Sequence, residues 1–160
     1  MSNQILLEEK FPEIKAVKKD IIKEAKKFKG FCDINAKGLL NVIYYLNELN
    51  TKLISINNQK SKRITLNKIE GFYFEVINLL HNIIENINNC KFRDFDDENY
   101  LKTCKFIDDC IKTNIKNLPI FNKKHLNQIN SEINNYRLLF NAKLEESTSF
   151  EKIICKYAFN

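Results

Sequence analysis

The chain has 160 residues, of which 44% are hydrophobic and 29% are charged. This size and composition predict a single folded domain over residues 1–160, and they exclude both a disordered chain and a membrane protein. With only three Gly and two Pro, the chain lacks the turn residues that all-β and α/β proteins need, so we expect long helices.

The charge and the cysteine content indicate which partners and which cellular compartment to expect. The chain carries 23 Lys and 3 Arg against 20 acidic residues, a net charge of +6. Arg is the residue that clamps phosphates and reads bases, so a surplus made almost entirely of Lys argues against a dedicated nucleic-acid reader. The first ten residues lack the basic segment and the apolar core of a signal peptide, so we expect no secretion, and no apolar stretch reaches roughly 20 residues. The five irregularly spaced cysteines fit no disulfide framework. We therefore expect a soluble cytoplasmic protein in a reducing compartment.

The first predicted helix begins at Pro12, which is tolerated at a helix's first position, and ends at Gly30. Its apolar residues fall on one narrow arc of the helical wheel, as an amphipathic helix requires. These residues are Ile14, Val17, Ile21, Ala25 and Phe28. We expect this arc to face the core.

A second helix is expected to start at Asp33 or Asn35 and to reach about Asn57. A polar link then leads to Thr65, a suitable N-cap for a third helix. The third helix carries apolar residues over an arc of about 160° on the wheel, far wider than in its neighbours. That width predicts that it is the central helix.

Asp96 is the predicted N-cap of a fourth helix. Leu118-Pro119-Ile120 interrupts the helical pattern, and a fifth helix with a nearly heptad apolar seam follows over residues 122–146. The capping-box spacing of Thr148 and Glu151 marks a last short helix. Together these elements predict an all-α, single-domain bundle of about five long helices plus a short C-terminal helix.

No catalytic or metal site is predicted, and we expect no cofactor. Neither His81 nor His125 belongs to a metal-binding motif, so we expect both to be partly exposed structural residues. The neighbouring carboxylates Asp108 and Asp109 point about 100° apart on a helix, which predicts two solvated side chains rather than an acid–base pair.

The cysteines nearest one another in sequence are Cys90, Cys104 and Cys110. Their spacings of 14 and 6 residues match no zinc motif. Cys104 and Cys110 fall on the apolar arc of their helix, where cysteine behaves as a small hydrophobe. We therefore expect these cysteines to be residues of the hydrophobic core.

The strongest functional signal lies in residues 10–30, which hold eight Lys against three acidic residues. Such a basic stripe suits a phosphate backbone, an acidic protein surface or an anionic membrane, and its alternative is a solvated face beside a core-facing seam. The candidate binding face comprises Lys15, Lys18, Lys19, Lys23, Lys26 and Lys27, and Lys60, Lys62 and Arg63 extend it if that link lies beside the first helix.

A second signal comes from apolar residues that fall outside the main arcs of their helices. Either these helices are packed on two sides, or the residues form a surface for a partner. Phe74 belongs to this group. The candidate partner surface comprises Tyr44, Tyr45, Leu138 and Leu139.

Three functions stay open. We favour a non-enzymatic helical interaction protein, such as an adaptor, a small subunit or a virus, phage or bacterial factor, that binds another protein with a helix face or groove. The alternative is a nucleic-acid-associated protein whose Lys-rich first helix contacts phosphates. An enzyme would need a pocket lined by His81 with Tyr or Glu neighbours. A homo-oligomer formed through the seam of the fifth helix is also compatible with the pattern.

Overall fold

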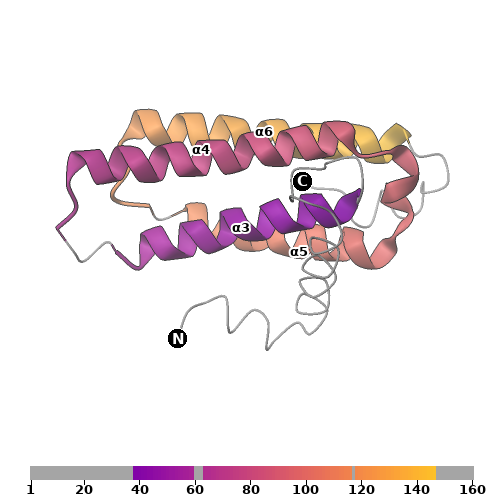
Figure 1. Ribbon diagram of the computed structural model, residues 1–160, viewed down its shortest axis with the longest axis horizontal. Coiled ribbons are helices and arrows are strands. Elements are labelled where there is room, and N and C mark those ends of the chain that lie inside the picture. Colours follow the sequence, from indigo (N-terminus) through magenta and orange to yellow (C-terminus); the bar gives the residue numbers. More distant parts are fainter. Residues whose placement is uncertain (1–37, 60–62, 117, 147–160) are drawn as a thin grey trace, which may run out of the picture.

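The computed structural model describes residues 38–59, 63–116 and 118–146 (Figure 1). These residues form α3 (Leu39–Asn57), α4 (Leu66–Asn89), the short 3-10 helix η1 (Phe92–Asp96), α5 (Glu98–Ile115) and α6 (Lys123–Glu146). The described residues contain no strand, so the predicted all-α class is confirmed. The helices predicted at 12–30 and 148–157 lie outside the described residues. The total number of helices therefore stays a prediction.

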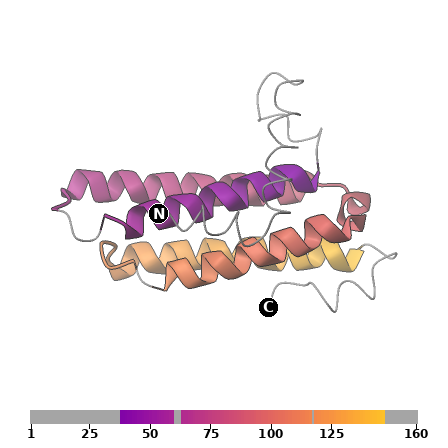
Figure 2. The ribbon, with the colours of Figure 1, turned by 90° about the horizontal axis from the view of Figure 1, so that it is seen from below.

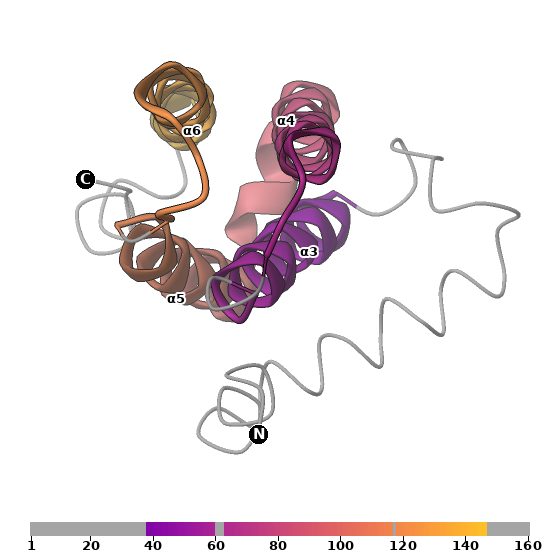
Figure 3. The same ribbon diagram turned by 90° about the vertical axis from the view of Figure 1, so that its left-hand side faces the viewer.

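The four α-helices form an elongated bundle in which each helix runs opposite to the one before it (Figures 1 and 2). Seen along the bundle, they occupy the corners of a square, with α4 and α5 on one diagonal (Figure 3). The close backbone contacts join α3 to α4, α3 to α5 and α4 to α6. None of the described helices is long and apolar enough to cross a bilayer.

The chain crosses this diagonal through η1, which closes one end of the bundle. Phe95 in η1 is fully buried, and its ring meets that of Phe140 on α6 edge to face with centroids 5.2 Å apart. This geometry is favourable for aromatic rings. At the opposite end, Leu118 and Phe121 in the α5–α6 link are buried as well. These two links thus cover the two ends of the core.

One of the two N-cap predictions for the described helices is confirmed, since the Thr65 hydroxyl accepts a hydrogen bond from the Lys68 N–H at 3.2 Å. The other is wrong by one residue, because Asp97 caps α5 rather than Asp96. Residues 92–96 close into the 3-10 turn, which places the first free N–H groups of α5 beyond Asp97. At the start of α6, Asn122 Oδ1 accepts a hydrogen bond from the His125 N–H at 2.8 Å.

The helix that is most buried is α3, and this corrects the prediction that α4 would be central. Twelve of the 19 residues of α3 are buried, against six of the 24 residues of α4, although each of these helices lies against two others. The wide apolar arc of α4 is only partly covered, and its Leu66 is 81% exposed. The width of the apolar arc therefore overstated how much of α4 is buried, since part of that arc faces outward.

The seam of α6 packs inside this chain's own bundle. Its residues Ile129, Ile133, Tyr136, Phe140 and Leu144 are at most 2% exposed. These five residues of the seam are thus used by contacts within the chain, and Leu126, the first residue of the predicted seam, is half-buried. A bundle core and a dimer seam need the same spacing, so the homo-oligomer stays a prediction.

Candidate functional site

The Lys-rich candidate face cannot be placed in this fold. Lys15, Lys18, Lys19, Lys23, Lys26 and Lys27 lie outside the described residues, as do Lys60 and Lys62. Arg63 is described and exposed. The described residues carry 13 basic and 13 acidic side chains, so the whole surplus of +6 belongs to the other residues.

The four residues of the candidate apolar surface do not share one environment. Tyr44 and Tyr45 pack edge to face with centroids 5.0 Å apart, and Tyr45 is only 9% exposed. Leu139 is half-buried against the core, whereas its neighbour Leu138 is 69% exposed. Packing on two sides therefore accounts for the tyrosines, and Leu138 stays as an exposed apolar side chain on α6.

A groove of about 570 Å³ runs between α4 and α6 on the side that carries Leu139. Its lining residues are His81, Ile84, Glu85, Asn88 and Asn89 from α4, and Glu132, Asn135 and Leu139 from α6. Ile84 and Leu139 are half-buried and continuous with the core, so they supply an apolar floor. The remaining lining residues are polar or acidic.

His81 and Glu132 face each other across this groove, with Nε2 and Oε2 3.5 Å apart. The Glu132 side chain is only 14% exposed, whereas that of His81 is 61% exposed. Gln128 Nε2 also donates to Glu132 Oε1 at 3.3 Å. A carboxylate with little access to water is thus held by a neutral amide and an imidazole.

The groove meets the condition that the enzyme hypothesis set, since His81 lines it with Glu85 and Glu132 as neighbours. The lining residues include no serine, cysteine, threonine, tyrosine or lysine. A nucleophile activated by the imidazole, which covalent catalysis requires, is therefore missing from this lining. The geometry offers hydrogen bonds and negative charge to a ligand.

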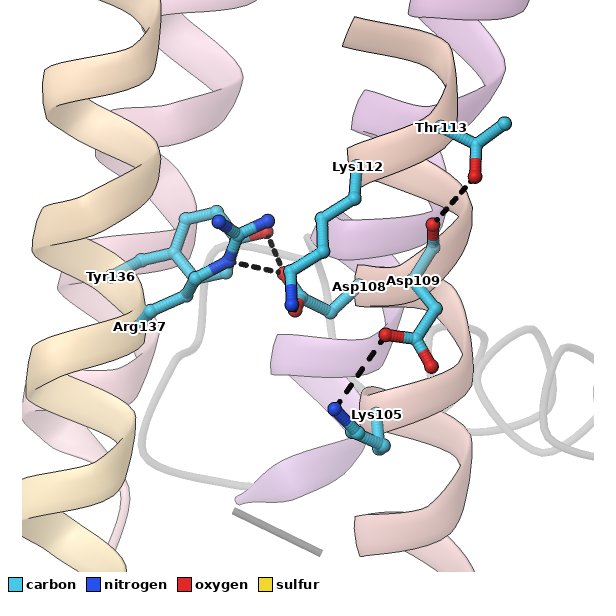
Figure 4. A network of polar contacts seen from close by, with 7 residues as sticks. All are labelled: Lys105, Asp108, Asp109, Lys112, Thr113, Tyr136 and Arg137. Atoms are coloured by element: carbon cyan, nitrogen blue, oxygen red, sulfur yellow. Dashed lines mark hydrogen bonds and ion pairs between the residues drawn. The ribbon is translucent and has the colours of Figure 1, made fainter. Parts of the chain in front are cut away.

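A buried polar network joins α5 to α6 (Figure 4). Asp108 is fully buried, accepts a hydrogen bond from the Tyr136 hydroxyl, and accepts another from Arg137 Nε at 3.0 Å. Lys112 Nζ lies 4.0 Å from its second oxygen. The prediction that Asp108 is solvated is therefore wrong, because Arg137 supplies a counter-charge inside the bundle.

Asp109 behaves as predicted. It is exposed and pairs with Lys105 of its own helix, with Nζ and Oδ1 3.6 Å apart (Figure 4). The sequence held a signal for the difference, since Leu101, Cys104, Asp108 and Ile111 repeat at spacings of three, four and three residues. This is a heptad seam with a carboxylate at one core position.

His125 is buried, which corrects the prediction of a partly exposed side chain. It is 8% exposed, stacks on Tyr73 with centroids 4.3 Å apart, and places Nε2 2.9 Å from Glu70 Oε1. Because Asn122 caps the helix from which His125 projects, the ring is fixed at the start of α6. The cluster ties the N-terminal turns of α4 and α6 together.

No protein family, curated protein or solved structure matches this chain. Its function must therefore be argued from its own geometry.

The described cysteines are thiols of the interior. Cys90 and Cys104 are 3% and 0% exposed, and Cys110 is half-buried. Burial raises the pKa of Cys90 to about 12 and that of Cys110 to about 11, and it raises the pKa of Cys104 well above its ordinary value. The described residues contain no group of three or more His, Cys, Asp or Glu that could hold a metal ion.

Proposed function

We propose that this chain is a non-enzymatic helical protein that binds another protein through the outer face of α4 and α6. The observation that carries the proposal is the α4–α6 groove, whose apolar floor includes Leu139. The next side chain along α6, that of Leu138, is exposed. Apolar side chains that remain exposed next to a groove are typical of protein-binding surfaces.

Two features of the bundle support this proposal. Phe74 is 59% exposed and lies seven residues before His81 on α4, so both project from the same side of that helix. The interior of the bundle is filled by its own side chains, with residues such as Leu80 and Phe140 at 0% exposure. A partner is therefore expected on the outside of the α4–α6 pair.

Site-specific photocrosslinking tests this function. A photoreactive phenylalanine analogue at Leu138 should give a discrete adduct with a partner in the cells that naturally make the protein. The same analogue at Thr113, an exposed position on α5, serves as the matched control and should give none. The purified partner should then bind the unmodified chain, and Leu138→Asp should weaken binding at least about tenfold. Equal adducts from both positions, or none from either, would contradict the proposal.

The alternative function is contact with nucleic-acid phosphates through the Lys-rich face of residues 10–30. The charge distribution supports this alternative, because the described residues are neutral overall and eight lysines fall in that segment. Binding would rest on counterion release and would weaken steeply with salt. Fluorescence anisotropy with generic DNA and RNA measures it, and changing Lys15, Lys19, Lys23 and Lys26 to Glu should abolish it. No binding at low salt would exclude this alternative.

A further inference from the structure

We propose that the α4–α6 groove receives an amphipathic helix whose apolar face is flanked by Lys or Arg. This inference rests on the proposed protein-binding function and names the chemical class of the partner. Its basis is the juxtaposition of an apolar floor, formed by Ile84 and Leu139, with the carboxylates of Glu85 and Glu132.

The dimensions of the groove suit a short helical segment. Its lining runs from His81 to Asn89 on α4, which at 1.5 Å per residue is about 12 Å, or slightly more than two helical turns. An extended strand has no unpaired strand edge to join here, because both walls are helices. A helix with apolar residues at i, i+3, i+4 and i+7 presents its side chains over this length.

The charge of the groove selects a basic partner. The side chain of Glu132 is only 14% exposed. Its partners among the described residues are Gln128 and His81. Neither carries a permanent positive charge, so this carboxylate lacks the fixed counter-ion that buried charges normally have. A Lys or Arg from a partner helix would supply it.

The end of α4 adds to this negative potential. The groove reaches Asn88 and Asn89 in the last turn of α4, where a helix presents the negative end of its dipole. Lys143 offsets part of that potential, since its Nζ donates to the backbone carbonyls of Asn88 and Cys90 at 3.1 and 3.4 Å. Lys143 therefore stabilises the end of α4 without supplying a counter-charge to Glu132.

The net charge of the full chain is +6, so specific binding of a basic peptide can be distinguished from non-specific attraction. A chain with that net charge attracts acidic peptides in a non-specific manner. Two labelled 18-residue peptides would be compared by fluorescence anisotropy, one with leucines at the apolar positions flanked by lysines, and one with the same leucines flanked by glutamates. We expect the Lys-flanked peptide to bind at least about tenfold more tightly.

Two matched double variants test whether the Lys-flanked peptide binds in the groove. Glu85→Gln with Glu132→Gln should weaken binding of the Lys-flanked peptide about tenfold. Glu145→Gln with Glu146→Gln makes the same change in charge at exposed positions at the end of α6, and it should leave binding unchanged. Circular dichroism would verify that both variants are folded.

A fluorescent reporter gives an independent readout. The chain has no Trp, so Asn135→Trp puts a single indole in the lining of the groove. Its emission should change when the Lys-flanked peptide is added and should not change with the Glu-flanked peptide.

The inference is overturned if the Glu-flanked peptide binds equally well, if the control variant loses as much affinity as the groove variant, or if neither peptide binds at about 1 mM. The photocrosslinking at Leu138 does not depend on the charge of the partner. An adduct at Leu138 without peptide binding would refute the basic-helix inference and leave the proposed function standing.

Discussion

Arg137 on α6 donates from Nε to Oδ1 of Asp108 on α5 across 3.0 Å, and this contact joins two helices that share few close backbone contacts. Asp108 is fully buried, and the side chain of Arg137 is 16% exposed. The network of Asp108, Arg137 and Tyr136 therefore fixes how α5 and α6 pair.

Removing one member of this network should destabilise the bundle. Arg137→Met leaves the buried Asp108 carboxylate without its hydrogen-bonded counter-charge and with only the more distant Lys112, whose Nζ lies 4.0 Å away, so the free energy of unfolding should fall by about 3 kcal/mol. Urea denaturation measures the loss. Lys105→Met, which removes an exposed ion pair on the same helix as Asp108, is the control and should cost no more than about 0.5 kcal/mol.

Replacing the whole network by apolar residues should restore most of that stability. The triple variant Asp108→Leu, Tyr136→Phe and Arg137→Met leaves no buried charge and no buried hydroxyl without a partner. We expect it to be more stable than Arg137→Met alone in the same urea experiment. A triple variant as unstable as the single one would show that packing, rather than the buried charge, sets the cost.

Replacing each of the two described glycines by alanine should change the free energy of unfolding in opposite directions. Gly38 has a φ of +53°, and a Cβ there would lie 2.5 Å from the Asp94 carboxyl carbon. Gly38→Ala should therefore lower the free energy of unfolding by at least about 1–2 kcal/mol. Gly71 lies within α4 with nothing within 4 Å of an added Cβ, so Gly71→Ala should raise it by about 0.5–1 kcal/mol. Thermal unfolding measures both variants against the wild-type chain. A Gly38→Ala variant as stable as wild type would contradict the first argument, and a Gly71→Ala variant less stable than wild type would contradict the second.

Stability should fall as the solution becomes alkaline. Burial raises the pKa of Cys104 well above its ordinary value of 9.0, and burial together with Asp108 raises the pKa of Tyr136 well above 10.0. Above pH 9 the unfolded chain loses these protons while the folded chain keeps them, so the unfolded state binds fewer protons. The free energy of unfolding then decreases with pH, by up to about 1.4 kcal/mol per pH unit for each group.

The alkaline effect is measured by urea denaturation between pH 8 and pH 11. Cys104→Ala removes one of the buried ionisable groups, so the free energy of unfolding of this variant should decline less steeply than that of the wild-type chain. Parallel declines in the two proteins would contradict the contribution assigned to Cys104.

Thiol labelling should distinguish the described cysteines. The thiolate is the reactive form, and burial both suppresses it and blocks the reagent. At pH 8 we expect iodoacetamide to label Cys110, which is half-buried, at least about tenfold faster than Cys104, which is fully buried. Mass spectrometry of the digested protein measures both rates, and 6 M urea should equalise them. Equal rates in the folded protein would contradict the burial of Cys104.

Much of the fold was accessible from the sequence because helix signals are local. The N-cap at Thr65, the start of α6 after Asn122 and the seam of Ile129, Ile133 and Tyr136 follow from residues within one or two turns of one another. The candidate groove was not accessible, because His81 and Glu132 are brought together only when α4 and α6 pack side by side.

What the sequence by itself determined was the all-α class and most bounds of the described helices, since capping and apolar periodicity act within a helix. The exceptions are α3, which begins at Leu39 rather than at Asp33 or Asn35, and α5, whose N-cap is Asp97 rather than Asp96. What only the tertiary structure decided was the environment of individual polar side chains. Asp108 and Asp109 are neighbours in sequence, yet one is buried and the other exposed. The difference arises because Tyr136 and Arg137, 28 and 29 residues further along the chain, offer Asp108 a proton donor and a counter-charge within the bundle.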